Sequence, residues 1–328
     1  MNDFDERERL AWLRLIRSEN IGPATFRRLI NQFGSAKAAL DQLPKLARRG
    51  GRSRPLGICS PERAKREIAQ VEKAGARMIF MCEDDYPAIL SNIHDPPPVI
   101  TVKGHAHLLS RPAVAIVGAR NASAAGQRMA AQLPRDIGAA GYVIVSGLAR
   151  GIDGAAHKAA MVQGTIAVIA GGIDIVYPRE HAELHRQIAE NGLLITEAPF
   201  ATRPSARHFP RRNRLIAGLS RGIVVVEAAA KSGSLITARL ALEQGRDVFA
   251  VPGSPLDPRA RGTNLLLREG AILVETAADV LDNLAPLTGL GRMNCRCCAG
   301  DGQPRYRQIS ARKRANASTA CSARPRYR

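Results

Sequence analysis

The sequence has few aromatic residues, few cysteines outside its last segment, and no long apolar run. Aromatic side chains make up 4% of the 328 residues, so the core must be built from Val, Ile, Leu and Ala. Only Cys59 and Cys82 precede the last segment, which is typical of a protein kept in a reducing compartment. The polar N-terminus MNDFDERERL is unlike a secretory signal, and no run has the length of a membrane span. We therefore expect a cytoplasmic protein.

Acidic residues are scarce relative to basic ones, and the formal net charge is +19. Such a charge favours a polyanionic partner. Residues 288–328 hold ten Lys or Arg and one acid, Asp301, so they supply +9 of this excess. Because apolar periodicity stops there, residues 286–328 are predicted to be a basic, disordered tail, or the product of an out-of-frame translation. Cys295, Cys297 and Cys298 lack the second Cys or His pair of a zinc site, so no metal is expected.

Residues 1–45 are predicted to form a small helical domain of the SAM or helix-hairpin-helix type. Apolar residues recur at helical spacing on both sides of the turn Ile21-Gly22-Pro23, and the second stretch ends at Gly34. The N–H groups of such a turn can hold a phosphate, but a packing role is favoured because one hairpin is a weak signal. Residues 46–75 are predicted to be a basic linker followed by a helix starting at residues 60–61.

From residue 76 to residue 285, short β-branched apolar runs alternate with helix-like stretches. The predicted strands are 77–82, 113–117, 142–145, 165–170, 193–196, 222–226, 248–251 and 272–274. The predicted helices between them are 123–140, 151–163, 180–190, 213–219 and 234–243. This alternation predicts an α/β fold with an extended Rossmann-like, doubly wound, mostly parallel sheet. Because ligands of such sheets bind beyond the carboxyl ends of the strands, the residues that follow each strand are the candidates for a site.

Small residues and one arginine follow the first strands of this region. Gly118 and Arg120 lie in a turn where free N–H groups at a helix start and a planar guanidinium suit a phosphate. The turn lacks G-x-G-x-x-G spacing, and no acid follows the next strand to hold a ribose, so a dinucleotide cofactor is not indicated. The next strands end in residues that permit either a tight turn or close approach to a ligand: Ser146, Gly147, Gly171 and Gly172.

The segment from Ala198 to Val226 has charge of one sign only. It contains no acid and six arginines: Arg203, Arg207, Arg211, Arg212, Arg214 and Arg221. Arginine grips phosphates bidentately, and Phe209 offers a base a stacking surface, although a core role for this ring stays open. Asn213 is expected to cap the following helix or to bind a phosphate. Together these residues predict a groove for a single strand of nucleic acid.

Two further motifs are superficially similar to those of enzymes. Ser232 and Ser234, in the run KSGS, begin a helix and can hold an anion, but a Walker P-loop is absent, so ATP hydrolysis is not indicated. Asp153 and His157 are four residues apart on one helix face. Because no Ser or Cys nucleophile is tied to them by a known motif, a structural hydrogen bond between Asp153 and His157 is favoured over catalysis.

Seven motifs, in register, resemble those of the DNA-processing protein A (DprA/Smf) family. They are IVGAR, SGLARGIDGAAH, GGIDIVYP, TEAPF, FPRRNRLIAGLS, VVVEAAAKSGSLITARLALEQGRDVFAVPG and GTNLLLREGA. The resemblance covers residues 80–283 closely and the helical N-terminus more loosely. It implies a non-catalytic protein without a cofactor that binds and protects incoming single-stranded DNA. It also implies loading of the RecA recombinase in natural transformation and DNA recombination, and a homodimer.

The resemblance also implies which residues bind DNA. In the family the pocket is formed by the Gly-x-Arg turn and the F-P-x-R-N-R segment. Those residues are here Gly118, Arg120, Phe209, Arg211, Asn213 and Arg214. Small residues are expected to line the same pocket: Ser146, Gly147, Gly171, Gly172 and Ser232. Many members carry a winged-helix domain after the core, whereas residues 288–328 lack its periodicity, so a function tied to that domain is in doubt.

Two alternatives stay open. Rossmann-like phosphoribohydrolases of the lysine-decarboxylase-like group carry the signature P-G-G-x-G-T followed by Glu, to which Pro252-Gly253-Ser254 is the nearest approach here. Release of free base from nucleoside monophosphates would identify such an enzyme. A scaffold for an acidic protein would also explain the charge, and competition between heparin and an oligonucleotide separates it from a DNA-binding protein.

Overall fold

The structure is a computed structural model that describes residues 5–49 and 56–284. The predictions of a disordered tail over 286–328, of a missing winged helix and of an empty Cys295–Cys298 cluster lie outside these residues. Part of the predicted linker, residues 50–55, also lies outside them. The N-terminal helices and the sheet belong to one compact unit.

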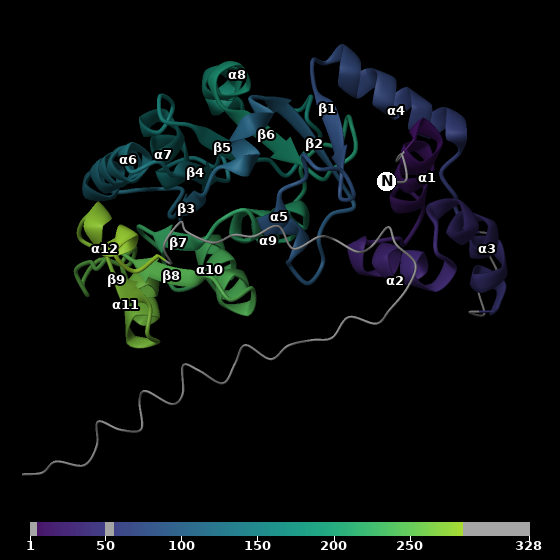
Figure 1. Cartoon of the computed structure of the whole chain (residues 1–328). Helices are drawn as coiled ribbons and strands as arrows, with labels where there is room; N and C mark the ends of the chain where they lie inside the picture. The colour runs from purple at the N-terminus through teal and green to yellow at the C-terminus, as the bar shows by residue number, and fades with distance from the viewer. Residues whose placement is uncertain (1–4, 50–55, 285–328) are drawn as a thin grey trace, which may run out of the picture. The chain divides into compact units, whose positions relative to one another are not determined.

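A nine-stranded sheet forms the centre of this unit, with strand order β1-β2-β6-β5-β4-β3-β7-β8-β9 (Figure 1). The strands are β1 (Arg77–Phe80), β2 (Val99–Gly104), β3 (Ala113–Val117), β4 (Val143–Ser146), β5 (Thr165–Val168), β6 (Leu193–Thr196), β7 (Gly222–Val225), β8 (Asp247–Ala250) and β9 (Ile272–Leu273). Strands β3 to β9 pair in parallel, and β1 and β2 extend the sheet antiparallel beyond β6. The predicted doubly wound, mostly parallel sheet is confirmed. Strand β2 was not predicted.

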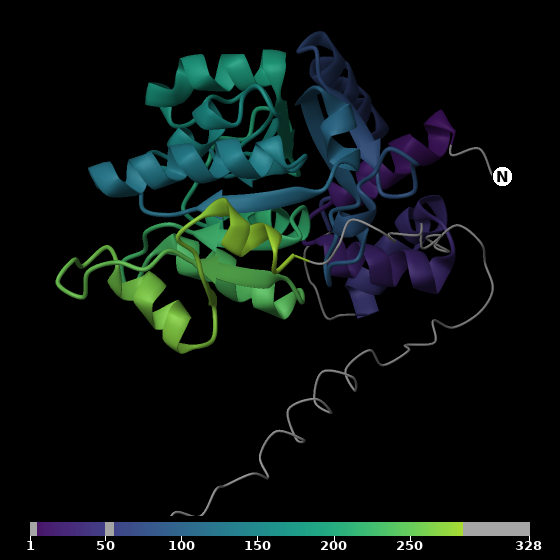
Figure 2. The same ribbon diagram turned by 60° about the vertical axis from the view of Figure 1, so that its left-hand side comes forward.

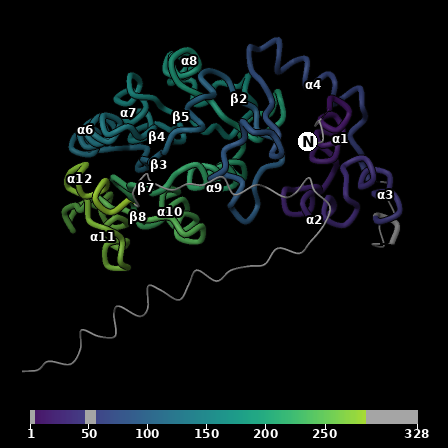
Figure 3. The backbone as a smooth tube through the Cα atoms, in the orientation of Figure 1, coloured from purple at the N-terminus to yellow at the C-terminus, as the bar shows by residue number. Residues whose placement is uncertain are grey.

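Helices cover both faces of the parallel strands, which explains why every residue of β3, β4, β5, β6 and β7 is buried. One face carries α6 (Ala124–Ala139), α7 (Ile152–Ala159) and α8 (Ala182–Asn191) (Figure 3). The opposite face carries α9 (His208–Gly218), α10 (Gly233–Glu243) and α11 (Arg261–Arg268), as the turned view of Figure 2 also shows. The short α12 (Ala277–Leu281) packs against α6. This is the layering that right-handed βαβ crossovers produce.

Four helices precede the sheet: α1 (Glu6–Ile16), α2 (Pro23–Phe33), α3 (Ala36–Arg49) and α4 (Pro61–Lys73). The predicted Gly-Pro entry into α2 is confirmed: Pro23 occupies the first turn, and Gly34 ends the helix in the left-handed conformation. Helix α3 contains Pro44 and continues into the segment that was predicted to be a linker. Helices α1 and α4 join through a buried ion pair of 2.9 Å between Arg17 and Glu67.

No helix among the residues that the structure describes is both long and apolar enough to traverse a bilayer. The same residues contain no group of three His, Cys, Asp or Glu side chains that could hold a metal ion.

Candidate nucleic-acid interface

The winding of the sheet reverses at β3, which lies between β4 and β7. In a doubly wound sheet this switch point opens a crevice at the carboxyl edge, because the helices on its two sides leave in opposite directions. The loops that follow β3, β4, β5 and β7 all meet at this edge. They are joined by the first turns of α9, which enters β7 and therefore begins at the same edge.

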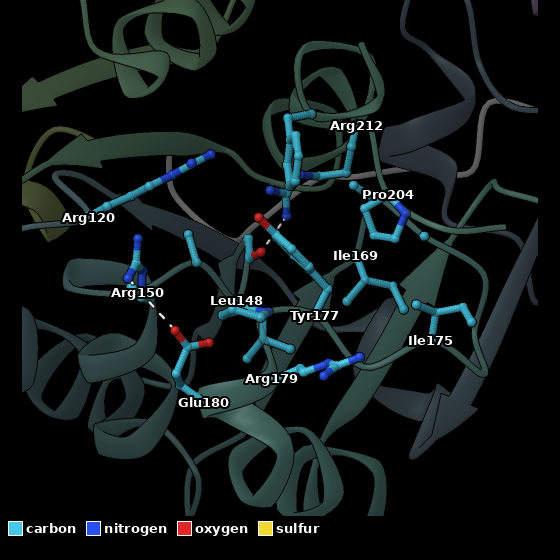
Figure 4. Close-up of a pocket in the computed structure, with 16 residues that line it drawn as sticks. Arg120, Leu148, Arg150, Ile169, Ile175, Tyr177, Arg179, Glu180, Pro204 and Arg212 are labelled. Atoms are coloured by element: carbon cyan, nitrogen blue, oxygen red, sulfur yellow. Dashed lines mark hydrogen bonds and ion pairs between the residues drawn. The ribbon is translucent and has the colours of Figure 1, made fainter. Parts of the chain in front are cut away.

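Two adjoining pockets occupy the crevice. The first has a volume of about 430 Å³ and lies over the ends of β4 and β5; Figure 4 shows Arg120, Arg150, Arg179 and Arg212 around it. The second has a volume of about 480 Å³ and lies between the turn after β3 and the start of α10. Arg120, Phe209 and Arg212 line both pockets. The site is therefore one continuous basic surface with an aromatic ring at its middle.

The guanidinium of Arg120 lies over the ring of Phe209, with its Cζ atom 5.4 Å from the ring centroid. Arg120 is exposed, and no carboxylate in the described part of the chain forms an ion pair with it. The ring of Tyr177 lies 5.5 Å from that of Phe209, centroid to centroid, and is 47% exposed. This arrangement offers one free cation and two aromatic faces side by side, which are the groups that hold a phosphate and a base.

Arg212 is a buried cation in the floor of the site. Its Nη1 donates to the carbonyl oxygen of Gly147, at 2.5 Å, and to that of Val168. Asp153 carries the balancing charge and accepts hydrogen bonds from the N–H groups of Gly147, at 3.1 Å, and Ala149, at 3.3 Å. Burial lowers the pKa of Arg212 to about 10 and raises the pKa of Asp153, while their mutual attraction opposes both shifts. Arg212 and Asp153 thus fix the loop after β4 from both sides.

Further cations surround the crevice. Arg150 forms an exposed ion pair of 3.7 Å with Glu180. Because solvent screens this pair, Arg150 can readily exchange Glu180 for a phosphate. Lys231 is exposed at the entrance to α10, and Ser232 caps that helix by accepting from the N–H of Ser234 at 3.3 Å. The helix start predicted at this position is confirmed.

The structure brings seven of the predicted site residues to the two pockets. Gly118, Arg120, Gly147, Gly171, Phe209, Asn213 and Ser232 line one pocket or both. Asn213 lies inside α9, which starts five residues earlier than predicted, so it does not cap that helix. Its side-chain amide instead approaches the carbonyl oxygen of Gly233 at 3.4 Å.

The other four predicted residues lie outside these pockets. Ser146 is fully buried and donates to the carbonyl oxygen of Ile116 at 2.6 Å. A Cβ on Gly172 would lie 2.7 Å from the carbonyl oxygen of Pro199, so this glycine accommodates a neighbouring loop of the protein itself. Arg211 lines a third, smaller pocket and pairs with Glu197 at 3.1 Å.

Arg214 is also away from the crevice. Its side chain is 7% exposed and is held by two carboxylates, through an ion pair with Glu197 and another of 3.2 Å with Asp95. Its Nη1 also donates to the carbonyl oxygen of Asp95 at 2.6 Å. Arg214 thus has its charge balanced within the fold by Glu197 and Asp95, and it lines neither of the two pockets.

The expected hydrogen bond between Asp153 and His157 is not formed. Asp153 bonds to the loop after β4, whereas Nδ1 of His157 lies 2.7 Å from Oγ1 of Thr165, in the core. Asp153 and His157 therefore have structural roles, as expected, but each bonds to a partner other than the one predicted. Burial, followed by His181 and Arg212, lowers the pKa of His157 to about 3, so this imidazole is neutral at neutral pH.

Two residues of the site were not predicted. Arg212 was one of six arginines in its segment, and nothing local distinguished it from Arg211 or Arg214. Tyr177 follows the two glycines after β5, and its neighbour Phe209 is far away in the sequence. The prediction started α9 at Asn213, whereas the helix begins at His208. The correct start would have shown which arginines share a face of this helix.

These features define a doubly wound α/β protein whose switch point is suited to a phosphate-bearing ligand. The sequence model of the DNA recombination-mediator protein A family matches residues 77–285, and that of the DprA-like N-terminal HHH domain matches residues 6–69. This chain therefore belongs to the DNA recombination-mediator protein A family.

Individual members of this family are also similar to this chain. DNA processing protein DprA of Bacillus subtilis (strain 168) is 46% identical over 222 residues, which are 67% of this chain and 75% of that protein. The X-ray structure of DNA processing protein A from Streptococcus pneumoniae has a TM-score of 0.64 at 36% identity, covering 82% of this chain and 100% of that one. DNA processing protein A from Helicobacter pylori, whose structure was described for its single-stranded DNA binding mode, has a TM-score of 0.58 at 30% identity, covering 64% and 97%.

Proposed function

We propose that this chain binds single-stranded DNA at the carboxyl edge of its sheet and acts as a non-catalytic recombination mediator. The observation that carries the proposal is the stack of Arg120 on Phe209 between two basic pockets. The Helicobacter pylori relative, described as a single-stranded DNA binder, supports it.

The geometry suggests how a strand would lie. Bases would stack on the exposed ring of Tyr177 and on the half-buried ring of Phe209 beside it, because any base can stack on an aromatic ring. Phosphates would contact Arg120 at the centre and Lys231 at the start of α10, where the positive end of the helix dipole also attracts an anion. A duplex holds its bases inside and could use only the phosphate contacts, so single strands should bind more tightly.

Membership of the family supports a finer role as a proposal. We propose that the protein protects incoming DNA and loads the RecA recombinase during natural transformation, in the cytoplasm and as a homodimer. For the dimer, the exposed leucines around α11 and the edge strand β9 are the candidate surface: Leu265 is 41% exposed and Leu273 47%. Light scattering of Leu265→Arg tests it, and a mass equal to that of the unaltered protein would exclude this surface.

The DNA-binding proposal is tested by fluorescence anisotropy with labelled single- and double-stranded oligonucleotides across a salt series. We expect a preference for single strands and a linear fall of log affinity with log salt, with a slope of about −0.7 for each phosphate contact. Equal affinity for duplex, or binding that salt leaves unchanged, would refute it.

A further inference from the structure

Helix α6 begins directly after the turn that carries Arg120, and it has no acidic residue in its own first turn. A carboxylate from another strand lies there instead. Glu227 follows β7, and its Oε2 accepts a hydrogen bond of 3.0 Å from the backbone N–H of Ser123, the N-cap of α6. Its Oε1 accepts from the hydroxyl of the same serine. The positive end of α6 is thus neutralised from across the switch point.

Gly126 makes room for this carboxylate. A Cβ at Gly126 would lie 2.5 Å from Cδ of Glu227 and 2.6 Å from its Oε1. The N–H of Gly126 also donates to Oγ of Ser123 at 2.9 Å, so the serine connects the helix start to the glutamate. The carboxylate therefore lies flat against the first turn of α6.

In dinucleotide-binding sheets of this type, the helix after the first strand of the switch point receives the ligand's pyrophosphate at its N-terminus. In this chain that helix is α6, because β3 is the switch strand. The N-terminus of α6 already holds the negative charge of the Glu227 carboxylate. A free nucleotide that placed its phosphate there would meet Glu227 at short range, and repulsion would oppose its binding.

The same carboxylate restrains one end of the turn that presents Arg120. The other end is restrained by α7: a Cβ on Gly118 would lie 2.6 Å from Cγ1 of Ile152, and the N–H of Ile152 donates to the carbonyl oxygen of Ala119 at 3.2 Å. Arg120 lies between these two attachments and is itself exposed. Loss of the glutamate would free the turn on the side of Ser123.

We propose that Glu227 determines the ligand class of this site. Its carboxylate takes the place of a nucleotide phosphate on α6, so it excludes free nucleotides, and it positions Arg120 for the phosphates of a strand that crosses the crevice. This inference rests on the proposed DNA binding.

The test compares Glu227→Ala with Glu243→Ala, a matched loss of one negative charge at an exposed residue on the far end of α10. Simple charge removal should strengthen DNA binding in both variants. Positioning by Glu227 predicts the opposite sign: Glu227→Ala binds single-stranded DNA about tenfold more weakly than the unaltered protein, the loss expected for one charged hydrogen bond. Calorimetry with ADP should detect binding to Glu227→Ala and none to the unaltered protein or to Glu243→Ala.

A double-mutant cycle separates positioning from general damage. If Glu227 acts through Arg120, the variant Glu227→Ala/Arg120→Ala binds DNA no more weakly than Arg120→Ala alone. Glu227→Gln, which keeps an acceptor for the N–H of Ser123, should recover most of the lost DNA affinity and remains available if the alanine variant does not fold. The inference is overturned if Glu227→Ala behaves like Glu243→Ala in DNA binding, or if it binds no ADP. Failure of the unaltered protein to bind single-stranded DNA would instead overturn the proposed function.

Discussion

Replacing Arg214 by alanine should destabilise the protein and leave DNA binding intact, although the sequence placed this residue in the DNA site. The substitution leaves the carboxylate of Glu197, whose side chain is 11% exposed, without its closest cation. Asp95 loses its ion pair too, but it is 36% exposed and remains hydrated. The cost is therefore mainly that of a buried carboxylate that loses its closer cation and keeps only Arg211, at 3.1 Å.

Breaking a buried ion pair by removing one partner costs about 3–5 kcal/mol, and the hydration of Asp95 places this case near ~3 kcal/mol. For a protein of this size, such a loss lowers the melting temperature by about 5 °C. Arg120→Ala is the matched comparison, because it removes the same side chain from an exposed position. It should change stability by less than about 0.5 kcal/mol.

Thermal melting and anisotropy, measured well below both melting temperatures, distinguish the two arginines. We expect Arg120→Ala to weaken single-strand binding about tenfold and to reduce the salt slope by about 0.7, because one phosphate contact is lost. Arg214→Ala should retain nearly full affinity. An unchanged melting temperature with weakened DNA binding in Arg214→Ala would show that this assignment of roles is mistaken.

Three other predictions follow from the same contacts. Phe209→Ala should weaken single-strand binding by about 1–3 kcal/mol in anisotropy without changing the salt slope, since stacking releases no counterions, whereas a changed slope would point to a phosphate contact. Gly147→Ala should lower the melting temperature, because the new Cβ would lie 2.5 Å from Nη1 of Arg212; loss of that charged hydrogen bond costs about 2 kcal/mol, and Gly233→Ala, with open space around it, should melt normally. Buried His157 titrates at about 3 when folded and 6.5 when unfolded, so stability should fall as pH drops below 6.5, by up to about 1.4 kcal/mol per pH unit. The melting temperature of His157→Asn should lack this part of the dependence on acid pH. Identical pH profiles of melting for the variant and the unaltered protein would contradict the argument from burial.

The parallel sheet could be predicted from local pattern alone. The prediction gave the correct bounds for two strands, Ala113–Val117 and Leu193–Thr196. Strands that are buried on both faces are continuous apolar runs, whereas strands with one solvent-exposed face alternate apolar and polar residues. Strand β2 was missed: it follows a proline-rich stretch and does not belong to the strand–helix alternation, since it pairs antiparallel at the sheet's end.

The candidate site could be predicted only in part. Residues that directly follow parallel strands, such as Gly118 and Gly147, reach the crevice because topology alone brings those loops to one edge. Residues on α9 are different, because each step along a helix turns the side chain by about 100°. Arg212 and Arg214 are two residues apart and therefore point to separate surroundings.

The sequence by itself determined the winding of the chain, the edge at which the site lies and the family, because all three depend on local patterns and their order. Only the tertiary structure decided which arginines are free for a ligand. That choice depends on where distant carboxylates lie: Glu197 and Asp95 come from other elements to occupy Arg214, Asp153 balances Arg212, and no acid reaches Arg120 in the described part of the chain. An arginine can bind a ligand's phosphate when no carboxylate of the protein already pairs with it. Whether such a carboxylate lies close enough is decided by the folded structure.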